Sequence, residues 1–261
     1  MALKNILFIL FITLGSTIKA QDAPNKIDAA GKKQGAWIKY DADKKKVYEG
    51  TFLNDKPTGK FNYYYNSGIL KAEMLFLKNG TTSYAKLYHP GGKIMGEGKY
   101  VNEKKDSLWK FYDEEAKILS EETYINGKKN GISKVFYRNG QVSEIKNWKN
   151  GELDGAVKKY FEDGQLKYSS QYINGKVEGK TLYYHTNGKI NAEGIYKNDL
   201  KDGSWKYYNE DGKLERTDVY INGRLQGEDK SIITKEQLEK EKQQSEKFNT
   251  KDPYSEEYRG E

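Results

Sequence analysis

Histidine is the side chain most often used for proton transfer near neutral pH, and this chain has two. His89 and His185 lie four periods apart in a 24-residue repeat that organises most of the sequence. If each repeat supplies two strands, eight strands separate the two rings, or roughly 38 Å at about 4.8 Å per strand. The two histidines therefore cannot share a catalytic or metal site, and we interpret both as variable surface residues.

A column of glutamates recurs with the same period. Glu49, Glu73, Glu97 and Glu121 follow one another, and Glu193 occupies the equivalent position further along. Carboxylates in adjacent repeats would lie about 9.6 Å apart, the upper end of the ~6.5–9.5 Å that separates the two carboxyls of an inverting glycosidase. An open sheet offers no closed cleft to raise the pKa of one carboxyl above its neighbour's. We therefore expect these side chains to pair with lysines across the strands.

Other common chemistry needs residues or loops that the sequence does not contain. The chain has no cysteine, which excludes disulfides, thiol catalysis and thiolate metal sites. No phosphate-binding loop of the Walker type occurs, and Gly96-Glu-Gly98 is not followed by a helix pattern. We expect no catalytic residue, no metal and no cofactor, and therefore a protein that is not an enzyme.

Eight 24-residue repeats run without insertion or deletion from Gly35 to Gln226, and two positions are aromatic in all of them. The sixth position holds Tyr40, Tyr64, Tyr88, Tyr112, Phe136, Tyr160, Tyr184 and Tyr208. The eighteenth holds Phe52, Phe76, Tyr100, Tyr124, Trp148, Tyr172, Tyr196 and Tyr220. Because a column that spans every repeat is usually framework, we expect both columns to pack along one face. The alternative is a platform on which sugar rings or partner side chains stack.

Each half of the repeat also carries a turn signal. Positions nine and ten read Asn-Gly or Asp-Gly in four repeats, and position twenty is Asn in seven. Such pairs between aromatic and β-branched runs favour β-hairpins, because both residues tolerate positive φ. We predict an all-β fold, an elongated single-layer antiparallel β-meander of eight hairpin repeats. Sixteen strands would extend roughly 77 Å.

The pattern Gly-x-Trp-x-x-Tyr followed by Tyr-x-Asn-Gly-Lys-x-x-Gly resembles the variant MORN repeat. This repeat occurs in bacterial proteins often labelled as YwqK-like antitoxins of toxin–antitoxin systems. The resemblance covers residues 35–227 and implies an elongated single-layer sheet of consecutive hairpins, a scaffold or interaction role, and no shared catalytic residues. Lys44 and Lys46 in the first repeat depart from the pattern, as do Ser83 and Ser107 at the start of the third and fourth. These departures concern local hairpin geometry.

Three segments flank the repeat sheet of residues 35–227. Residues 1–20 have the charged start, the apolar run and the small residues of a secretory signal peptide, and the alternative is an uncleaved N-terminal anchor. Residues 21–34 are polar and small and read as a linker. In the tail, 228–261, we predict a short charged helix over 235–247 and disorder beyond it. The helix would cover the last strand, whose unpaired backbone groups otherwise invite edge-to-edge association. The alternative is a detached, solvated helix.

Positive charge is concentrated in the repeats. The whole chain has a formal charge of +7 and the tail is acidic, so residues 21–227 carry about +8. A basic sheet favours anionic partners, such as envelope polymers, lipid headgroups or an acidic protein. The alternative is that the lysines are solvated charges that keep an open sheet soluble. Export argues against nucleic acid as the partner.

Aromatic residues that vary between repeats are our candidates for partner binding, because conformity to the repeat indicates framework. They are Tyr63, Tyr65, Tyr137, Phe161, Tyr183 and Tyr207. We expect a non-enzymatic exported protein, periplasmic or extracellular, that acts as a protein-binding scaffold or neutralises a toxin as an immunity protein does. The alternative is a protein that binds cell-envelope glycan or a membrane surface. The oligomeric state is left open.

Export predicts a defined first residue. Lys4, the apolar run of residues 6–14 and the small residues up to Ala20 form the regions of a signal peptide. Mass spectrometry of the protein from its native cells should therefore find Gln21 at the N-terminus. An intact chain in the cytoplasm would contradict export and favour an ordinary cytoplasmic antitoxin.

Overall fold

The computed structural model describes residues 23–77 and 80–226, and these residues form eighteen β-strands with no helix. The predicted signal peptide and C-terminal helix lie outside the described residues. The strands are β1 Lys26–Ile27, β2 Lys33–Tyr40, β3 Lys46–Leu53, β4 Lys56–Tyr64, β5 Leu70–Phe76, β6 Thr82–Tyr88, β7 Ile94–Val101, β8 Lys104–Tyr112, β9 Ile118–Ile125, β10 Lys128–Phe136, β11 Val142–Lys149, β12 Glu152–Tyr160, β13 Leu166–Ile173, β14 Lys176–Tyr184, β15 Ile190–Lys197, β16 Leu200–Tyr208, β17 Leu214–Ile221 and β18 Arg224–Leu225. Strand β1 falls within the segment that we interpreted as a linker.

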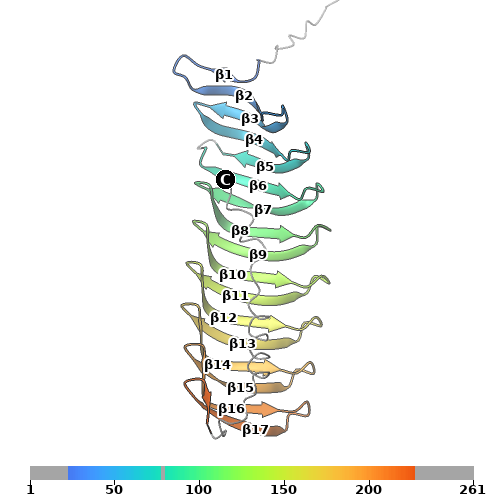
Figure 1. Cartoon of the computed structure of the whole chain (residues 1–261), viewed down its shortest axis with the longest axis vertical. Helices are drawn as coiled ribbons and strands as arrows, with labels where there is room; N and C mark the ends of the chain where they lie inside the picture. The colour runs from blue at the N-terminus through green and yellow to red at the C-terminus, as the bar shows by residue number, and fades with distance from the viewer. Residues whose placement is uncertain (1–22, 78–79, 227–261) are drawn as a thin grey trace, which may run out of the picture. The chain divides into compact units, whose positions relative to one another are not determined.

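The described chain divides into two compact units. The first unit holds residues up to 167 together with 172–175, and the second unit holds 168–171 together with residues from 176 onward. Within the first unit, β1 to β12 each pair antiparallel with their neighbours in the chain. Within the second unit, β14 to β18 do the same. This succession of hairpins, labelled in Figure 1, confirms the predicted all-β antiparallel meander.

The two turns of each repeat differ in geometry. At position twenty, Asn54 and Asp55 both have positive φ, 52° and 67°, as a two-residue type I′ turn requires. At positions nine and ten the loop is longer, and Gly140 has a φ of 84° while its N–H donates to the carbonyl of Tyr137. Lys44 takes the same left-handed conformation, φ 61°, at the equivalent point of the first repeat. The departure there leaves the hairpin intact.

The first position of the repeat is a β-bulge. In β8 the pairing with β7 jumps between Glu97 and Lys99, next to Ser107, whose φ is 62°. Ser107 therefore keeps the positive φ that glycine provides in other repeats. Ser83 does not have a positive φ. Strands β5 and β6 pair without a register shift, and Ser83 is a regular strand residue. Of the two serine departures, one preserves the bulge and the other removes it.

Alternation along the strands gives the sheet of each unit two distinct faces. The core face carries positions 3, 5, 14, 16 and 18 of the repeat, and the ladder face carries positions 2, 4, 6, 15 and 17. Our expectation that the two aromatic columns share a face is wrong. Tyr100, at position 18, packs edge-on against Trp109, at position 3, with ring centroids 4.8 Å apart. Tyr112, at position 6, follows Trp109 by three residues in the same strand, so it points to the opposite face.

The core face is organised by large rings that lie over glycines. Trp109 is fully buried, and a Cβ on Gly98 in the neighbouring strand would overlap its indole. The bulge leaves the carbonyl of Lys99 free to accept a hydrogen bond from Trp109 Nε1 at 3.0 Å. A ring also lies over a glycine at Phe61 and Gly50 and, in the second unit, at Trp205 and Gly194. Glycine at position 16 thus makes room for a ring at position 3 of the next repeat.

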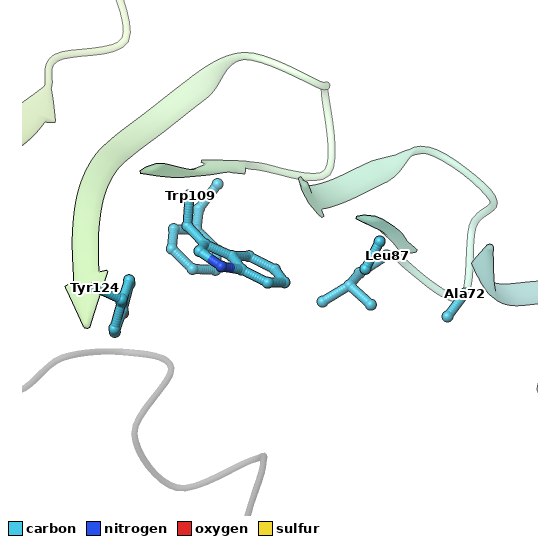
Figure 2. Packing of buried hydrophobic residues seen from close by; sticks show 6 residues of the cluster. Ala72, Leu87, Trp109 and Tyr124 are labelled. Atoms are coloured by element: carbon cyan, nitrogen blue, oxygen red, sulfur yellow. The ribbon is translucent and has the colours of Figure 1, made fainter. Parts of the chain in front are cut away.

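Where position 3 has a small side chain instead of a ring, the residue opposite it on the neighbouring strand is larger. Ala85 takes the place of the tryptophan and lies opposite Met74. A second pairing follows the same rule, with Ala72 opposite Leu87. Figure 2 shows Ala72, Leu87, Trp109 and Tyr124 on one side of the ribbon, as expected for a core built from one face. In these pairs a large side chain lies opposite a small one on the neighbouring strand.

This complementarity predicts coupling between Gly98 and Trp109. Trp109→Ala alone should cost about 3–5 kcal/mol because it leaves a cavity, and Gly98→Met alone should collide with the ring. The double variant recreates the pair formed by Met74 and Ala85. In urea unfolding it should therefore be more stable than the sum of the single effects by about 1 kcal/mol or more.

Gly98→Met combined with Trp205→Ala is the matched control, because these residues do not form a pair. Its two effects should add. Additive effects for Gly98 and Trp109 as well would contradict size complementarity as the basis of the core.

Candidate functional site

Three of the six predicted partner-binding residues occupy position five, on the core face. The ring centroid of Tyr63 lies 5.9 Å from that of Tyr48. In the second unit, Tyr183 lies 5.1 Å from Tyr168, and Tyr207 is half-buried. Tyr63 and Tyr183 make the same kind of ring contacts as the framework aromatics. Lys201 and Arg216 lie over the ring of Tyr207.

The other three, Tyr65, Tyr137 and Phe161, occupy position seven, in the longer turn. The Tyr65 hydroxyl donates to the carbonyl of Tyr88 at 2.7 Å. The Tyr137 hydroxyl donates to the carbonyl of Tyr160 at 2.6 Å. Each bond joins one hairpin turn to the equivalent point of the next repeat. Within the first unit, Tyr63 lies on the core face whereas Tyr65, Tyr137 and Phe161 lie in the longer turns. The role of the six residues in partner binding stays a prediction.

Both histidines make this same inter-turn link. His89 Nε2 lies 3.1 Å from the carbonyl oxygen of Tyr112, and in the second unit His185 Nε2 lies 2.8 Å from that of Tyr208. A carbonyl only accepts, so Nε2 carries the proton in each ring. The histidines are therefore structural donors that take the place of the tyrosine hydroxyls.

The predicted pairing of the glutamate column with lysines is present on the ladder face. Glu121 lies between Lys110, at 3.8 Å, and Lys134, at 4.0 Å. In the second unit Glu193 pairs with Lys180 at 3.1 Å. Successive strands thus present carboxylates and ammonium groups in alternation, and much of the positive charge on this face is neutralised locally.

The tyrosines of position six complete this ladder. The Tyr112 hydroxyl donates to Glu97 at 2.8 Å, and burial, aided by this bond, raises the pKa of Tyr112 to about 12. Tyr64 donates to Glu49 in the same way. Hydrogen bonds from Lys46 and then Tyr64 lower the pKa of Glu49 to about 2. Tyr64 and Tyr112 of the sixth-position column, and Tyr208 in the second unit, therefore contribute to the framework through their hydroxyl groups.

A groove of about 380 Å³ opens on the ladder face of the first unit. Its apolar wall consists of Leu75, Tyr84 and Leu108, which are 50%, 53% and 47% exposed. Charged side chains of the ladder, among them Lys86 and Glu97, line the rest. Half-exposed apolar side chains beside a polar rim are typical of surfaces that bind other molecules.

Lysines lie over the rings of the core face, and the sequence analysis did not predict these contacts. Lys105 Nζ lies 5.2 Å from the ring centroid of Trp109 and 4.6 Å from that of Phe111. In the second unit Lys201 Nζ lies 4.6 Å from Trp205. The signal was available: each tryptophan at position 3 follows a lysine by four residues, and Lys33 before Trp37 is the third example. These lysines are cation–π partners rather than fully solvated charges.

Neither a metal cluster nor a membrane-spanning helix occurs in the described residues. In 23–77 and 80–226 there is no group of three or more histidine, aspartate or glutamate side chains placed to hold a metal ion. Nor do these residues contain a helix long and apolar enough to span a membrane.

The lowered pKa of Glu49 predicts acid sensitivity. Its folded-state pKa lies below the ordinary value of 4.5, so its contribution to stability is full above about pH 4.5 and is lost as pH falls towards 2. Because about a third of the side chain is exposed, we expect Glu49→Gln to cost only about 1 kcal/mol at pH 7. Denaturant unfolding at a series of pH values should show this cost shrinking to nothing near pH 2.

Glu152→Gln, an exposed glutamate at the start of β12, is the matched control. It should leave the pH profile of stability unchanged. A Glu49→Gln cost that stays constant from pH 7 to pH 2 would exclude the proposed linkage.

Comparison with known proteins identifies the repeat. The family model described as "MORN repeat variant" matches six segments, residues 57–78, 84–102, 129–150, 153–174, 177–198 and 201–222. Repeats one and four are not matched, so the count of eight stays a prediction from spacing. No curated protein matches the chain.

Solved structures give only distant likenesses. TarM is 11% identical over 45% of this chain and 20% of its own, with a TM-score of 0.21. The Tc holotoxin pore of Photorhabdus luminescens is 13% identical over 75% of this chain and 12% of its own, also at 0.21. TcdB2-TccC3 is 12% identical over 77% and 14%, at 0.23. The chain thus spans a fifth or less of the length of each of these structures, and no functional argument rests on them.

Each matched segment spans most of one hairpin described above, and Gly98 and Gly194, two of the glycines that receive core rings, lie within these segments. The chain therefore contains six copies of the MORN repeat variant.

Proposed function

We propose that this protein is a non-enzymatic scaffold that binds a protein partner through the ladder face of its first unit. The observation that carries the proposal is the groove walled by Leu75, Tyr84 and Leu108, whose side chains are about half exposed. The framework does not account for these side chains, since the core forms on the other face. Arrays of repeats commonly offer such extended surfaces for binding.

The charge pattern favours a protein over an anionic polymer. Ladder-face lysines such as Lys110 and Lys134 face glutamate carboxylates, so the face presents both signs in alternation. A polyanion gains little from a surface whose positive charge is already paired. An apolar wall with a rim of mixed charge suits the apolar centre and polar margin of a protein interface.

The resemblance to YwqK-like proteins supports a finer proposal. An exported scaffold of this kind neutralises a protein effector in the envelope or outside the cell, as an immunity protein does. We propose no catalytic step. The glutamates that suggested acid–base chemistry are engaged on the ladder, as Glu97 is by the Tyr112 hydroxyl and Glu121 by two lysines. Binding of envelope glycan or a membrane surface is the alternative that the experiment must separate.

A pull-down with variants tests the proposal. The protein beginning at Gln21 is immobilised and incubated with the envelope and secreted fractions of its own cells. A protein that binds the groove should be retained by the wild type and reduced about tenfold or more by Leu75→Ser with Leu108→Ser, because these side chains form the apolar wall. Quantitative mass spectrometry gives the ratio.

Ile195→Ser is the matched control. Ile195 occupies the same repeat position as Leu75 in the second unit and is 52% exposed. It should retain the partner in full. Retention that is equal in all variants, or retention of polysaccharide or lipid without protein, would contradict a protein-binding groove.

A further inference from the structure

Half-exposed apolar side chains on the ladder face extend beyond the groove. Ile125 in β9 and Ile132 in β10 are 50% and 52% exposed, as are Leu75, Tyr84 and Leu108 of the groove wall to a similar degree. Together these five residues, which we call the apolar stripe, run across the strands of the first unit from β5 to β10. Five strand spacings of about 4.8 Å make the stripe roughly 24 Å long.

Lysines border the apolar stripe on the side of the tight turns. Lys128 lies directly opposite Ile125 in the β9–β10 hairpin, and Lys104 has the same repeat position in β8. Both lysines are exposed, and within residues 23–77 and 80–226 neither forms an ion pair with a carboxylate. With Glu103, the acidic neighbour of Lys104 in the chain, they form what we call the turn border, which is net positive.

The opposite border of the stripe is the ladder of glutamates and lysines, where the two signs alternate. Lys86 in β6 lies opposite Glu73 on one side and Glu97 on the other. Lys110 in β8 lies opposite Glu97 and Glu121 in the same way. This border therefore favours neither sign of charge. The excess of one sign beside the stripe lies along the turn border, and it is positive.

A polypeptide that covers the stripe must satisfy its own backbone. Strands β5 to β10 each pair with a neighbouring strand on both sides, so this surface has no free strand edge to which a partner strand can pair. In an α-helix the N–H and C=O groups bond within the helix itself. A helix of about 16 residues spans roughly 24 Å, the length of the stripe.

The spacing of the sheet also fits one face of a helix. Equivalent positions in successive repeats lie about 9.6 Å apart, and helix residues seven apart lie on the same face about 10.5 Å from one another. Side chains on one face of an extended strand recur every ~6.6–6.8 Å instead. Lys104 and Lys128, one repeat apart, are thus placed to meet two carboxylates that are seven residues apart in a helix.

We propose that the apolar stripe and the turn border together bind an amphipathic α-helix of the partner protein. Aliphatic side chains of the helix lie on the stripe, and aspartates or glutamates along one flank of the helix face Lys104 and Lys128. The inference rests on the proposed function, because it uses the same groove, and it names the element of the partner that fills the groove. The flank charges stay partly solvated, so they act on the association rate and on the choice of partner.

Fluorescence anisotropy of labelled synthetic peptides, titrated with the full chain, tests this. The first probe is a helix-forming peptide of about 16 residues with a leucine stripe and glutamates along one flank. The second has lysine in place of each glutamate, and the third has proline at the centre of the glutamate peptide, which breaks the helix. At low ionic strength the glutamate peptide should bind about tenfold or more tightly than either of the others, and salt should reduce its advantage over the lysine peptide.

Variants of the turn border separate specific from general attraction to a basic chain. Lys104→Glu with Lys128→Glu should weaken binding of the glutamate peptide about tenfold or more. Lys176→Glu with Arg224→Glu makes the same change of charge at the same repeat position in the second unit, and should change the affinity less than twofold. Glu103→Gln removes a negative charge from the border, so it should tighten binding about twofold or more, and this test stands if the double variant does not fold.

Four results would each overturn the helix proposal. They are no binding of the glutamate peptide by the wild type, equal binding of the proline peptide, equal weakening by the two double variants, and weaker binding by Glu103→Gln. The proposed function fails separately. A native protein whose retention depends on Leu75 and Leu108 but not on Lys104 and Lys128 would support a protein-binding groove and refute only the acidic helix as its occupant.

Discussion

The structure depends on the contact between a large side chain at position 3 and a small one at position 16 of the preceding strand. Within the described residues no helix or second sheet covers the meander, so apolar side chains must be buried against others of the same face. A ring such as Trp109 can lie flat only where the neighbouring strand has no side chain, which explains Gly98. At the bulge, a backbone carbonyl accepts the hydrogen bond of the indole N–H. Lys105 covers the ring from outside. The ring over a glycine thus explains the absence of a side chain at Gly98 and the position of a lysine.

The two faces meet different demands with the same aromatic-rich repeat. On the core face, rings exclude water by packing on each other. On the ladder face, the hydroxyl of a tyrosine such as Tyr112 serves as a donor to a glutamate, and lysines complete the network. Exposed ion pairs of this kind add little stability individually, but they place opposite charges side by side, as Glu121 lies between Lys110 and Lys134. The excess of lysine in the composition therefore says less about anionic partners than it first suggests, because many of these lysines cover rings or face carboxylates. What remains for binding is the apolar groove and the few places where the framework pattern fails.

Much of the fold could be predicted from the sequence because turns and aromatic columns repeat with a fixed period. The turn at position twenty has the positive φ angles that its Asn signals, as in Asn54. The face on which each side chain lies could not be predicted in the same way. Side chains alternate between the two faces along a strand, and each loop or bulge can add a residue that changes which positions share a face. Counting from Tyr112 to Tyr124 crosses a turn and a register shift between Phe111 and Tyr112, so an even separation does not keep the two rings on one face. The core pairs were missed for another reason. Position 3 is a tryptophan, a phenylalanine, an alanine, a serine, a valine or a threonine in different repeats. Its pairing with position 16 appears only when the opposite strand is considered.

That pairing rule also gives departures from the repeat a physical meaning. A change at one position is tolerated when its cross-strand partner compensates, as Met74 does for Ala85 by size and, in the second unit, as Ser170 does for Thr181 with a hydrogen bond of 2.6 Å. The candidate binding residues chosen for their variability include several, such as Tyr65, whose contacts are structural. Variation alone is therefore a weak indicator of function in such an array. The stronger indicator is a departure that the neighbouring strands do not fully compensate. On the ladder face, Leu108 and its neighbours stay half exposed with no framework contact to explain them. In this protein, the best candidates for function are therefore side chains whose exposure or polarity is not explained by a residue on the neighbouring strand.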